Sequence, residues 1–256
     1  MNVSIIQTGI EWEDKTHNLN HLGEIISSYN FKTDMIILPE MFNTGFSMNP
    51  ENLAESPDGN TFRWMMETSR KGNFGLCGSY IVKDNDQYFN RFLFTSPENE
   101  YWYYDKRHLF TMGGEKDSLS AGNNRVVFNF REVRISPYIC YDLRFPVWCR
   151  NRNDTDLMIY VANWPENRSE VWKILLRARA IENQCYVIGA NRIGVDGNGI
   201  KYSGDSQIID PKGNIIASAM VNEESCVSAD LSMSNLFDFR KKFPVADDAD
   251  NFTIIP

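Results

Sequence analysis

Apolar runs alternate with helix-like periodicities along the first part of the chain. The short runs at 3–8 and 34–40 predict strands, and the continuous apolar character of the second favours a strand covered on both faces. Apolar residues recur at helical spacing over 14–30 and again over 59–71, which predicts two helices. This order of strand, helix, strand and helix indicates a sheet with helices packed outside it.

Strands dominate the remainder of the chain. The polar segment 83–87 predicts a turn, and Pro211 with Gly213 predicts a hairpin turn, because proline fixes φ and glycine accepts positive φ. We predict strands within 75–82, 91–96, 101–106, 124–130, 133–140, 156–164, 185–191, 206–218 and 225–231. The whole pattern predicts a single α/β domain over 1–256, with large sheets and helices outside them.

The clearest helical pattern covers 169–183. Ser169 is its predicted N-cap. The predicted inward stripe consists of Val171, Ile174, Leu175, Ala178 and Ile181. The glycine-rich segment 194–199 is interpreted as a flexible loop, because it does not join a strand to a helix as phosphate-binding loops do. No G-x-G-x-x-G or Walker A pattern occurs, so no nucleotide cofactor is predicted.

Charge and hydropathy limit the classes of partner that the protein is expected to bind. The formal net charge is −8, whereas nucleic-acid binding requires a basic face. The one dense basic patch, 240–242, is interpreted as a solvated helix end. No run of about 18 apolar residues predicts a membrane span, and the first ten residues lack the basic segment and cleavage site of a signal peptide. We expect a cytoplasmic protein that binds neither nucleic acid nor membranes.

Cysteine and histidine usage indicates reduced thiols and no metal. The five cysteines are an odd number without a C-x-x-C pair, which fits a cytoplasmic protein. His17 and His21 lie four residues apart, but no cysteine or acidic partner completes a metal site. We therefore expect no metal and no other cofactor.

Three predicted strands end on reactive side chains: Glu40, Lys106 and Cys140. Ligand sites of α/β proteins collect at the carboxyl ends of strands, so neighbouring strands would bring the three together. Each residue also has an ordinary structural explanation. A buried cysteine often acts as a small apolar side chain, a glutamate can favour a helix N-terminus, and a lysine at a strand end is often solvated.

An acid, an amine and a thiol in one pocket would suit acyl transfer to water. Only a few per cent of an ordinary thiol is ionised at neutral pH, so a carboxylate would have to accept its proton. An ammonium would favour the thiolate and stabilise an oxyanion. The backbone N–H of Tyr141, which follows Cys140, could donate a second hydrogen bond to that oxyanion.

Ordered motifs along nearly the whole chain resemble the nitrilase, or carbon–nitrogen hydrolase, superfamily. They read LPEMFNTGF, YDKRHLF, GGE, CYDLRFP, YVANWP, RARAIENQCYVIGANR, YSGDSQIIDPKG and KFPVADDAD. The resemblance implies a four-layer α-β-β-α sandwich that forms a homodimer through helices and C-terminal segments. It also implies a Glu–Lys–Cys triad of Glu40, Lys106 and Cys140, with Glu115 as a second glutamate that orients Lys106 or the leaving ammonia.

Within the superfamily the chain most resembles the omega-amidase branch. Such enzymes hydrolyse the terminal amide of 2-oxo dicarboxylic acid monoamides, such as 2-oxoglutaramate and 2-oxosuccinamate, to the 2-oxo acid and ammonia. The branch usually clears the 2-oxo acid amides left by glutamine-dependent transamination, including that of methionine salvage. The substrate carboxylate would need a cation, and Arg144 is the candidate, with a salt bridge to Asp142 as the structural alternative. Phe42, Tyr141 and Trp164 could wall the pocket or simply pack in the core.

Other specificities remain open on sequence grounds. The rivals are hydrolysis of N-carbamoyl amines and hydrolysis of aliphatic amides. A true nitrilase is disfavoured, because nitrilases generally carry tryptophan after the nucleophile and this chain has Tyr141. A catalytically inactive relative that serves as a binding partner is a further alternative, which the intact Glu40, Lys106 and Cys140 disfavour.

Overall fold

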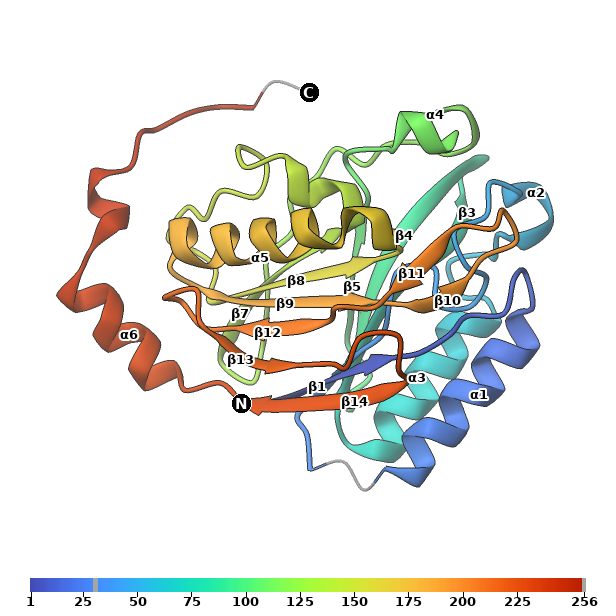
Figure 1. Ribbon diagram of the computed structural model, residues 1–256, viewed down its shortest axis with the longest axis horizontal. Helices are drawn as coiled ribbons and strands as arrows, with labels where there is room; N and C mark the ends of the chain where they lie inside the picture. The colour runs from blue at the N-terminus through green and yellow to red at the C-terminus, as the bar shows by residue number, and fades with distance from the viewer. Residues whose placement is uncertain (30–31, 255–256) are drawn as a thin grey trace.

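Two six-stranded mixed sheets form the centre of the molecule in the computed structural model, which describes residues 1–29 and 32–254 (Figure 1). The first sheet has the order β14-β1-β2-β3-β4-β5, and β1, β2 and β3 run parallel. Its strands are β1 (Asn2–Gln7), β2 (Met35–Ile37), β3 (Gly75–Asp84), β4 (Gln87–Thr95), β5 (Tyr101–Asp105) and β14 (Ser225–Asp230).

The second sheet has the order β13-β12-β9-β8-β7-β6, and β7, β8 and β9 run parallel. Its strands are β6 (Phe128–Phe130), β7 (Val133–Ile139), β8 (Leu157–Ala162), β9 (Tyr186–Asn191), β12 (Gln207–Ile209) and β13 (Ile215–Ser218). A separate antiparallel hairpin consists of β10 (Ile193–Val195) and β11 (Lys201–Ser203).

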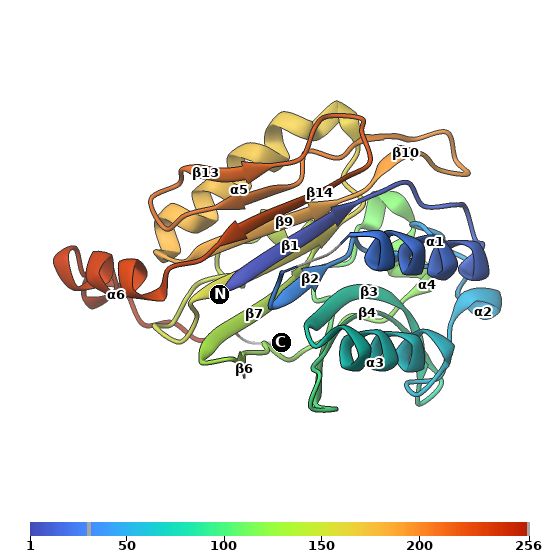
Figure 2. The ribbon, with the colours of Figure 1, turned by 90° about the horizontal axis from the view of Figure 1, so that it is seen from below.

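Helices cover both outer faces of the stacked sheets, as Figure 2 shows. The α-helices are α1 (Lys15–Ser28), α2 (Pro50–Leu53), α3 (Asn60–Gly72), α4 (Glu115–Ser118), α5 (Ser169–Asn183) and α6 (Met233–Lys242). The 3₁₀ turns are η1 (Thr111–Gly113), η2 (Cys140–Arg144), η3 (Glu166–Arg168) and η4 (Val245–Asp248). Helices α1 and α3 pack outside the first sheet and α5 packs outside the second, so the predicted four-layer α-β-β-α sandwich is confirmed.

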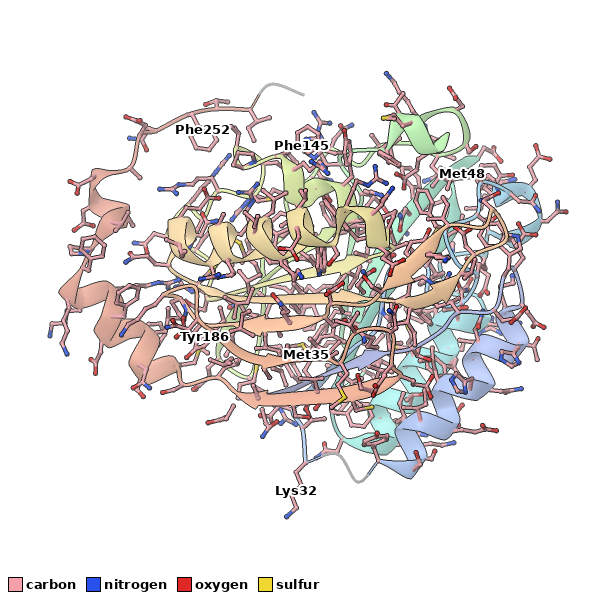
Figure 3. All side chains as sticks on the ribbon, in the orientation of Figure 1. Lys32, Met35, Met48, Phe145, Tyr186 and Phe252 are labelled. Carbon is pink, nitrogen blue, oxygen red and sulfur yellow. The ribbon has the colours of Figure 1, made fainter. Side chains whose placement is uncertain are left out.

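Strand β2 shows why its sequence is continuously apolar. Met35 and Ile37 belong to the core between the two sheets, and Ile36 faces the layer beneath α1 and α3. All three are fully buried, and Figure 3 shows Met35 among the side chains of the interior while Lys32 extends from the periphery. The prediction of a strand covered on both faces is confirmed, because side chains alternate between two packed layers.

Helix α5 occupies the predicted range but presents a different face. Trp172, Leu176 and Ala180 are buried, whereas Ile174 and Ile181 are 62% and 52% exposed, so the predicted inward stripe was wrong at these two isoleucines. Val171 and Leu175 of the predicted stripe are half-buried and pack against the core. Gly189 of β9 explains the choice: a Cβ there would lie 2.4 Å from Leu176 and 2.7 Å from Trp172, so only glycine admits this close packing.

The predicted N-cap of α5 was also wrong. Ser169 is the first residue of the helix, and its Oγ donates to Asp205 Oδ2 at 2.8 Å instead of capping the backbone. The hydroxyl of Ser169 therefore bonds to a residue distant in the sequence and not to the backbone of its own helix.

The segment 194–199 is an ordered turn and not a flexible loop. Its first two residues belong to β10 and the rest lead toward β11, and Asp196 Oδ1 accepts the backbone N–H groups of Asn198 and Ile200, each at 2.9 Å. The hairpin is thereby held in place, and it carries Asn198, Ile200 and Tyr202 to a cavity of about 900 Å³.

None of the helices within 1–29 and 32–254 has the length and apolar character needed to cross a bilayer.

Candidate active site

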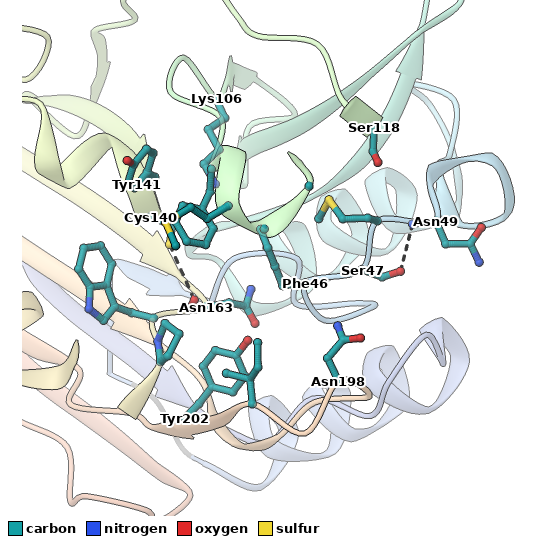
Figure 4. A pocket seen from close by; sticks show the side chains of 18 of the residues that line it. Phe46, Ser47, Asn49, Lys106, Ser118, Cys140, Tyr141, Asn163, Asn198 and Tyr202 are labelled. Carbon is teal, nitrogen blue, oxygen red and sulfur yellow. Dashed lines mark hydrogen bonds between the residues drawn. The ribbon is translucent and has the colours of Figure 1, made fainter. Parts of the chain in front are cut away.

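The three reactive strand ends meet, although their strands are not neighbours. Glu40 follows β2 and Lys106 follows β5, and these strands of the first sheet are separated by β3 and β4. Cys140 follows β7, which belongs to the second sheet. The side chains converge because the two sheets are stacked face to face, so the site spans both. Figure 4 shows two of them, Lys106 and Cys140, at the pocket.

Cys140 leaves its strand through a strained conformation. Its φ is +44°, in the left-handed region that residues with a Cβ seldom adopt, and η2 begins at this residue. Its Sγ lies 3.9 Å from the backbone oxygen of Asn163, as Figure 4 shows, and its side chain lines the cavity. The sharp turn thus directs the thiol out of the sheet and toward the cavity.

Lys106 is clamped between two carboxylates. Its Nζ donates to Glu40 Oε1 at 2.9 Å and to Glu115 Oε1 and Oε2 at 3.0 and 2.8 Å. All three side chains are fully buried. A buried ion needs this degree of pairing, since an unpaired one would be strongly destabilising. Glu115 therefore lies in the same cluster as the Glu–Lys–Cys trio.

Two asparagines that were not predicted as site residues hold these carboxylates. Asn90 Nδ2 donates both to Glu40 Oε1 at 2.8 Å and to Glu115 Oε1 at 3.1 Å. The backbone N–H of Asn163 donates to Glu40 Oε2 at 2.7 Å. Asn163 directly follows β8, so the strand-end rule that selected Cys140 would have found it. Asn90 lies within β4, where no local pattern marks it.

The electrostatics of the cluster favour a protonated resting thiol. Burial raises the pKa of Cys140, the carboxylate of Glu40 raises it further, and the ammonium of Lys106 offsets only part of this. Burial alone would lower the pKa of Lys106, but Glu115 and Glu40 outweigh it and raise that pKa. The lysine is thus a permanent cation, and the thiol requires a base to become nucleophilic.

The pKa of Glu115 is also raised. Burial is the main cause, opposed by Lys106 and assisted by the neighbouring carboxylate of Glu40. The two glutamates therefore differ in their contacts. Glu40 contacts Lys106 and also Asn163, the residue beside the thiol. Glu115 contacts Lys106 and accepts the N–H of Phe110 at 2.7 Å.

A cavity of about 900 Å³ lies in front of the thiol. Tyr141, Arg144 and Trp164 line it, as does Lys106 at its inner end. Phe42 does not: it is fully buried and packs against Trp64 and Tyr80 beneath α3, so the expectation that Phe42 walls the pocket is corrected.

Phe46 and Phe110 supply aromatic walls of the cavity in place of Phe42. The reason lies in how the chain leaves β2. The backbone N–H of Phe42 donates to Ser79 O at 3.1 Å, so this stretch follows β3 into the core layer before the chain reaches the cavity at Phe46.

Arg144 is not the partner of Asp142. The Asp142 carboxylate is fully occupied: it accepts from Tyr104 Oη at 2.8 Å, from the N–H groups of His108 and Ile139 at 3.0 Å, and contacts His108 Nδ1 at 2.8 Å. The guanidinium of Arg144 instead lies over the ring of Trp164, 5.0 Å from its centroid. Within 1–29 and 32–254 no carboxylate forms an ion pair with Arg144.

The other four cysteines do not line the cavity. Cys77, Cys149 and Cys185 are buried, Cys226 is half-buried, and all are free thiols. Burial raises the pKa of Cys185 to about 12 and that of Cys226 to about 11, so both thiols stay protonated near neutral pH. Cys140 is thus the one thiol, among the described residues, that faces the cavity.

Comparisons with known proteins place this site in a family. The chain matches the carbon–nitrogen hydrolase family profile over residues 2–241. The protein belongs to the carbon–nitrogen hydrolase family. It is 44% identical to an omega-amidase of Escherichia coli over 99% of this chain and 98% of the relative. It is 33% identical to a 2-oxoglutaramate amidase of Bacillus subtilis, with 96% of both chains covered.

Solved structures show the same fold. A CN-hydrolase superfamily protein of Xanthomonas campestris, described with an arsenic adduct in its active site, superposes with a TM-score of 0.95. It is 39% identical to this chain, and the match covers 99% of this chain and 98% of that one. This carbon–nitrogen hydrolase is therefore an enzyme acting on amide carbon–nitrogen bonds.

Proposed function

We propose that this carbon–nitrogen hydrolase is an omega-amidase that releases ammonia from 2-oxo dicarboxylic acid monoamides, such as 2-oxoglutaramate and 2-oxosuccinamate. The observation that carries the reaction class is the convergence of Cys140, Glu40, Lys106 and Glu115 in one cluster, of which Cys140 and Lys106 line the cavity. Full-length similarity to an omega-amidase and to a 2-oxoglutaramate amidase supports the substrate class.

Cys140 acts as the nucleophile and Glu40 as the general base. The thiol proton passes to the Glu40 carboxylate while Sγ bonds to the amide carbon, and the carbonyl oxygen becomes an oxyanion. The ammonium of Lys106 and the backbone N–H of Tyr141 stabilise this oxyanion. Glu40 then returns the proton to the amide nitrogen, the carbon–nitrogen bond breaks, and ammonia leaves behind a thioester.

Water completes the cycle. Glu40 accepts a proton from the water as its oxygen attacks the thioester carbon, the carbon–sulfur bond breaks, and the proton returns to Sγ. Glu115 holds Lys106 in position through two hydrogen bonds of 2.8 and 3.0 Å and keeps it charged. Glu40 accepts and returns the proton in both halves of this cycle.

Arg144 supports a substrate with a carboxylate at the end remote from the amide. Its guanidinium lines the cavity without an ion-pair partner among the described residues, and a guanidinium binds a carboxylate in a bidentate manner. Tyr141 and Trp164 would wall the same substrate. The physiological substrates would be 2-oxo acid amides left by glutamine-dependent transamination, including that of methionine salvage.

We further propose a cytoplasmic homodimer. Support comes from the exposed apolar side chains Ile174 and Ile181 on the outer face of α5, and from Phe237 and Phe243 at the C-terminal helix, which a second copy would cover.

A panel of amides assayed for ammonia tests the function. We expect turnover of 2-oxoglutaramate and 2-oxosuccinamate to exceed that of an aliphatic amide and of an N-carbamoyl amine. Cys140→Ala should abolish release of ammonia from every substrate, with circular dichroism and thermal unfolding unchanged apart from small effects at the site. Activity in Cys140→Ala would refute the mechanism, and turnover of N-carbamoyl compounds alone would refute the substrate class.

A further inference from the structure

We propose that Arg168 joins Arg144 to form a two-guanidinium subsite for the 2-oxo-carboxylate end of the substrate. This inference rests on the proposed omega-amidase function and adds a specificity-determining residue to it. Arg168 ends η3, twenty-eight positions beyond the nucleophile, and no sequence motif drew attention to it.

Arg168 is positioned by contacts with two aromatic residues of the cavity wall. Its guanidinium lies over the ring of Phe110, 5.3 Å from the centroid, and both residues line the cavity. Its backbone oxygen accepts a hydrogen bond from Trp164 Nε1 at 2.8 Å. Trp164 is also the ring beneath Arg144. Trp164 therefore contacts both arginines. The face of its ring packs against the guanidinium of Arg144, and its Nε1–H donates to the backbone oxygen of Arg168.

Both guanidinium groups are free for a ligand. Within 1–29 and 32–254, neither forms an ion pair or a side-chain hydrogen bond to protein. By contrast, Arg91, Arg125, Arg134 and Arg240 each bind an aspartate. The carboxylates that line the same cavity, Glu13 and Asp117, form no ion pair with either arginine, and Glu13 accepts a hydrogen bond from Ser47. Aromatic faces leave the N–H edges of a guanidinium available to an anion.

The charge of the inner site explains the need for two cations. Lys106 is surrounded by Glu40 and Glu115, so the buried cluster contains one more carboxylate than ammonium. An anionic substrate would be repelled by this excess at close range. Two unpaired guanidinium groups in the cavity offset this excess locally, at the end of the substrate that carries the carboxylate.

A 2-oxo-carboxylate group has enough acceptor oxygens to bind two guanidinium groups. A 2-oxo acid presents two carboxylate oxygens and an adjacent carbonyl oxygen in one plane. One guanidinium can pair with the carboxylate in a bidentate manner, and the second can donate to the outer lone pairs and to the 2-oxo oxygen. A cationic or neutral amide of similar length gains nothing from either arginine.

The test compares three amides of similar length in wild-type protein and in Arg168→Gln and Arg168→Lys. They are 2-oxoglutaramate, glutaramate, which lacks the 2-oxo group, and neutral pentanamide. We expect Arg168→Gln to lower the ratio of kcat/KM for 2-oxoglutaramate over that for pentanamide by about 10- to 100-fold, mainly through KM. Arg168→Lys should recover part of that ratio, because the charge remains while the fork is lost.

Arg152→Gln is the matched control. Arg152 also lies over an aromatic ring, at 5.3 Å from the centroid of Phe252, but it is exposed and does not line the cavity. Its substitution should leave the ratio unchanged. An unchanged ratio in Arg168→Gln, or an equal loss on the anionic and neutral amides, would overturn the proposal.

A failure of the Arg168 proposal can be distinguished from a failure of the proposed omega-amidase function. If wild-type protein fails to hydrolyse 2-oxoglutaramate yet prefers glutaramate to pentanamide, the same ratio test on glutaramate still decides the role of Arg168. Inhibition of pentanamide hydrolysis by 2-oxoglutarate gives an independent reading, because its inhibition constant should rise about 10-fold or more in Arg168→Gln.

Discussion

Asn90 links the two glutamates of the site through a single amide nitrogen. That nitrogen donates to Glu40 at 2.8 Å and to Glu115 at 3.1 Å, and the side chain is fully buried. Two like charges so close together need shared donors, and Lys106 and Asn90 supply them. Asn90 is therefore a positioning residue that acts through the two carboxylates.

Asn90→Leu tests this role. The substitution preserves volume approximately but removes the donor, so we expect kcat to fall about 10- to 100-fold with a smaller change in KM. Loss of the hydrogen bond should raise the pKa of Glu115 further and move the acid limb of the pH–rate profile to higher pH, because the bond favours the ionised form.

Asn129→Leu serves as the control for Asn90→Leu, since Asn129 is an exposed strand residue of β6. A loss of kcat with an unmoved acid limb would indicate general damage to the fold and not a positioning role.

At the scale of elements, a buried aspartate joins three segments that are distant in sequence. Asp156 precedes β8 and accepts from Arg134 of β7 at 2.7 and 2.8 Å and from Arg240 of α6 at 2.7 Å. Arg240 also donates to Thr155 O at 2.6 Å and to Gln184 O at 2.8 Å. The interpretation of 240–242 as a solvated helix end is thus wrong for Arg240, which docks α6 onto the second sheet.

Asp156→Asn should weaken this docking. We expect the free energy of unfolding at pH 7 to fall by about 1.5–3 kcal/mol, the range for hydrogen bonds to charged groups. Urea unfolding of both proteins measures the difference. Asp86→Asn is the control, because Asp86 is almost fully exposed and its pair with Lys83 is long, at 3.6 Å. Equal effects in the two variants would contradict the anchoring role.

The same pair of variants has a defined pH dependence. Burial alone would raise the pKa of Asp156, but the hydrogen bonds and charge of Arg134, with the bond from Arg240, outweigh it and lower that pKa. A carboxyl with a depressed folded-state pKa stabilises the protein fully above its unfolded value of about 3.9 and loses this contribution as the pH falls through the folded-state value. The difference in stability between wild type and Asp156→Asn should therefore begin to shrink below about pH 4 and vanish only below the folded-state pKa of Asp156.

At the scale of the whole molecule, the site exists only because two sheets are stacked. Lys106 and Glu40 approach from the first sheet, and Cys140 and Asn163 approach from the second. Glu40 is the link, since it bonds Lys106 through one oxygen and Asn163 through the other. Any opening of the sandwich would separate the proposed nucleophile, Cys140, from the proposed base, Glu40, so we expect stability of the fold and activity to be coupled.

The proposed homodimer belongs to the same scale. Sedimentation of the purified protein should give a mass of about 59 kDa, twice the 29.6 kDa of the chain. Replacement of Ile174 and Ile181 with lysine should shift the mass toward that of the monomer, because it places charges on the exposed apolar face of α5. A monomeric wild type at micromolar concentration would contradict the assembly.

The sequence by itself determined the order and type of most elements, because apolar periodicity and turn residues act locally. It also singled out Glu40, Lys106 and Cys140 as candidate site residues, since each stands at the end of an apolar run. It misjudged the buried face of α5, because the room left by Gly189 selects Trp172 and Leu176 over the more apolar stripe.

Only the tertiary structure decided how the site is assembled. The strands that carry Glu40, Lys106 and Cys140 are not adjacent, so their meeting depends on the stacking of two sheets. Asn90 and Arg168 carry no local signal, and Phe42 and Arg144 could each face either core or cavity. These choices depend on contacts between residues far apart in the chain, which periodicity along the sequence does not encode.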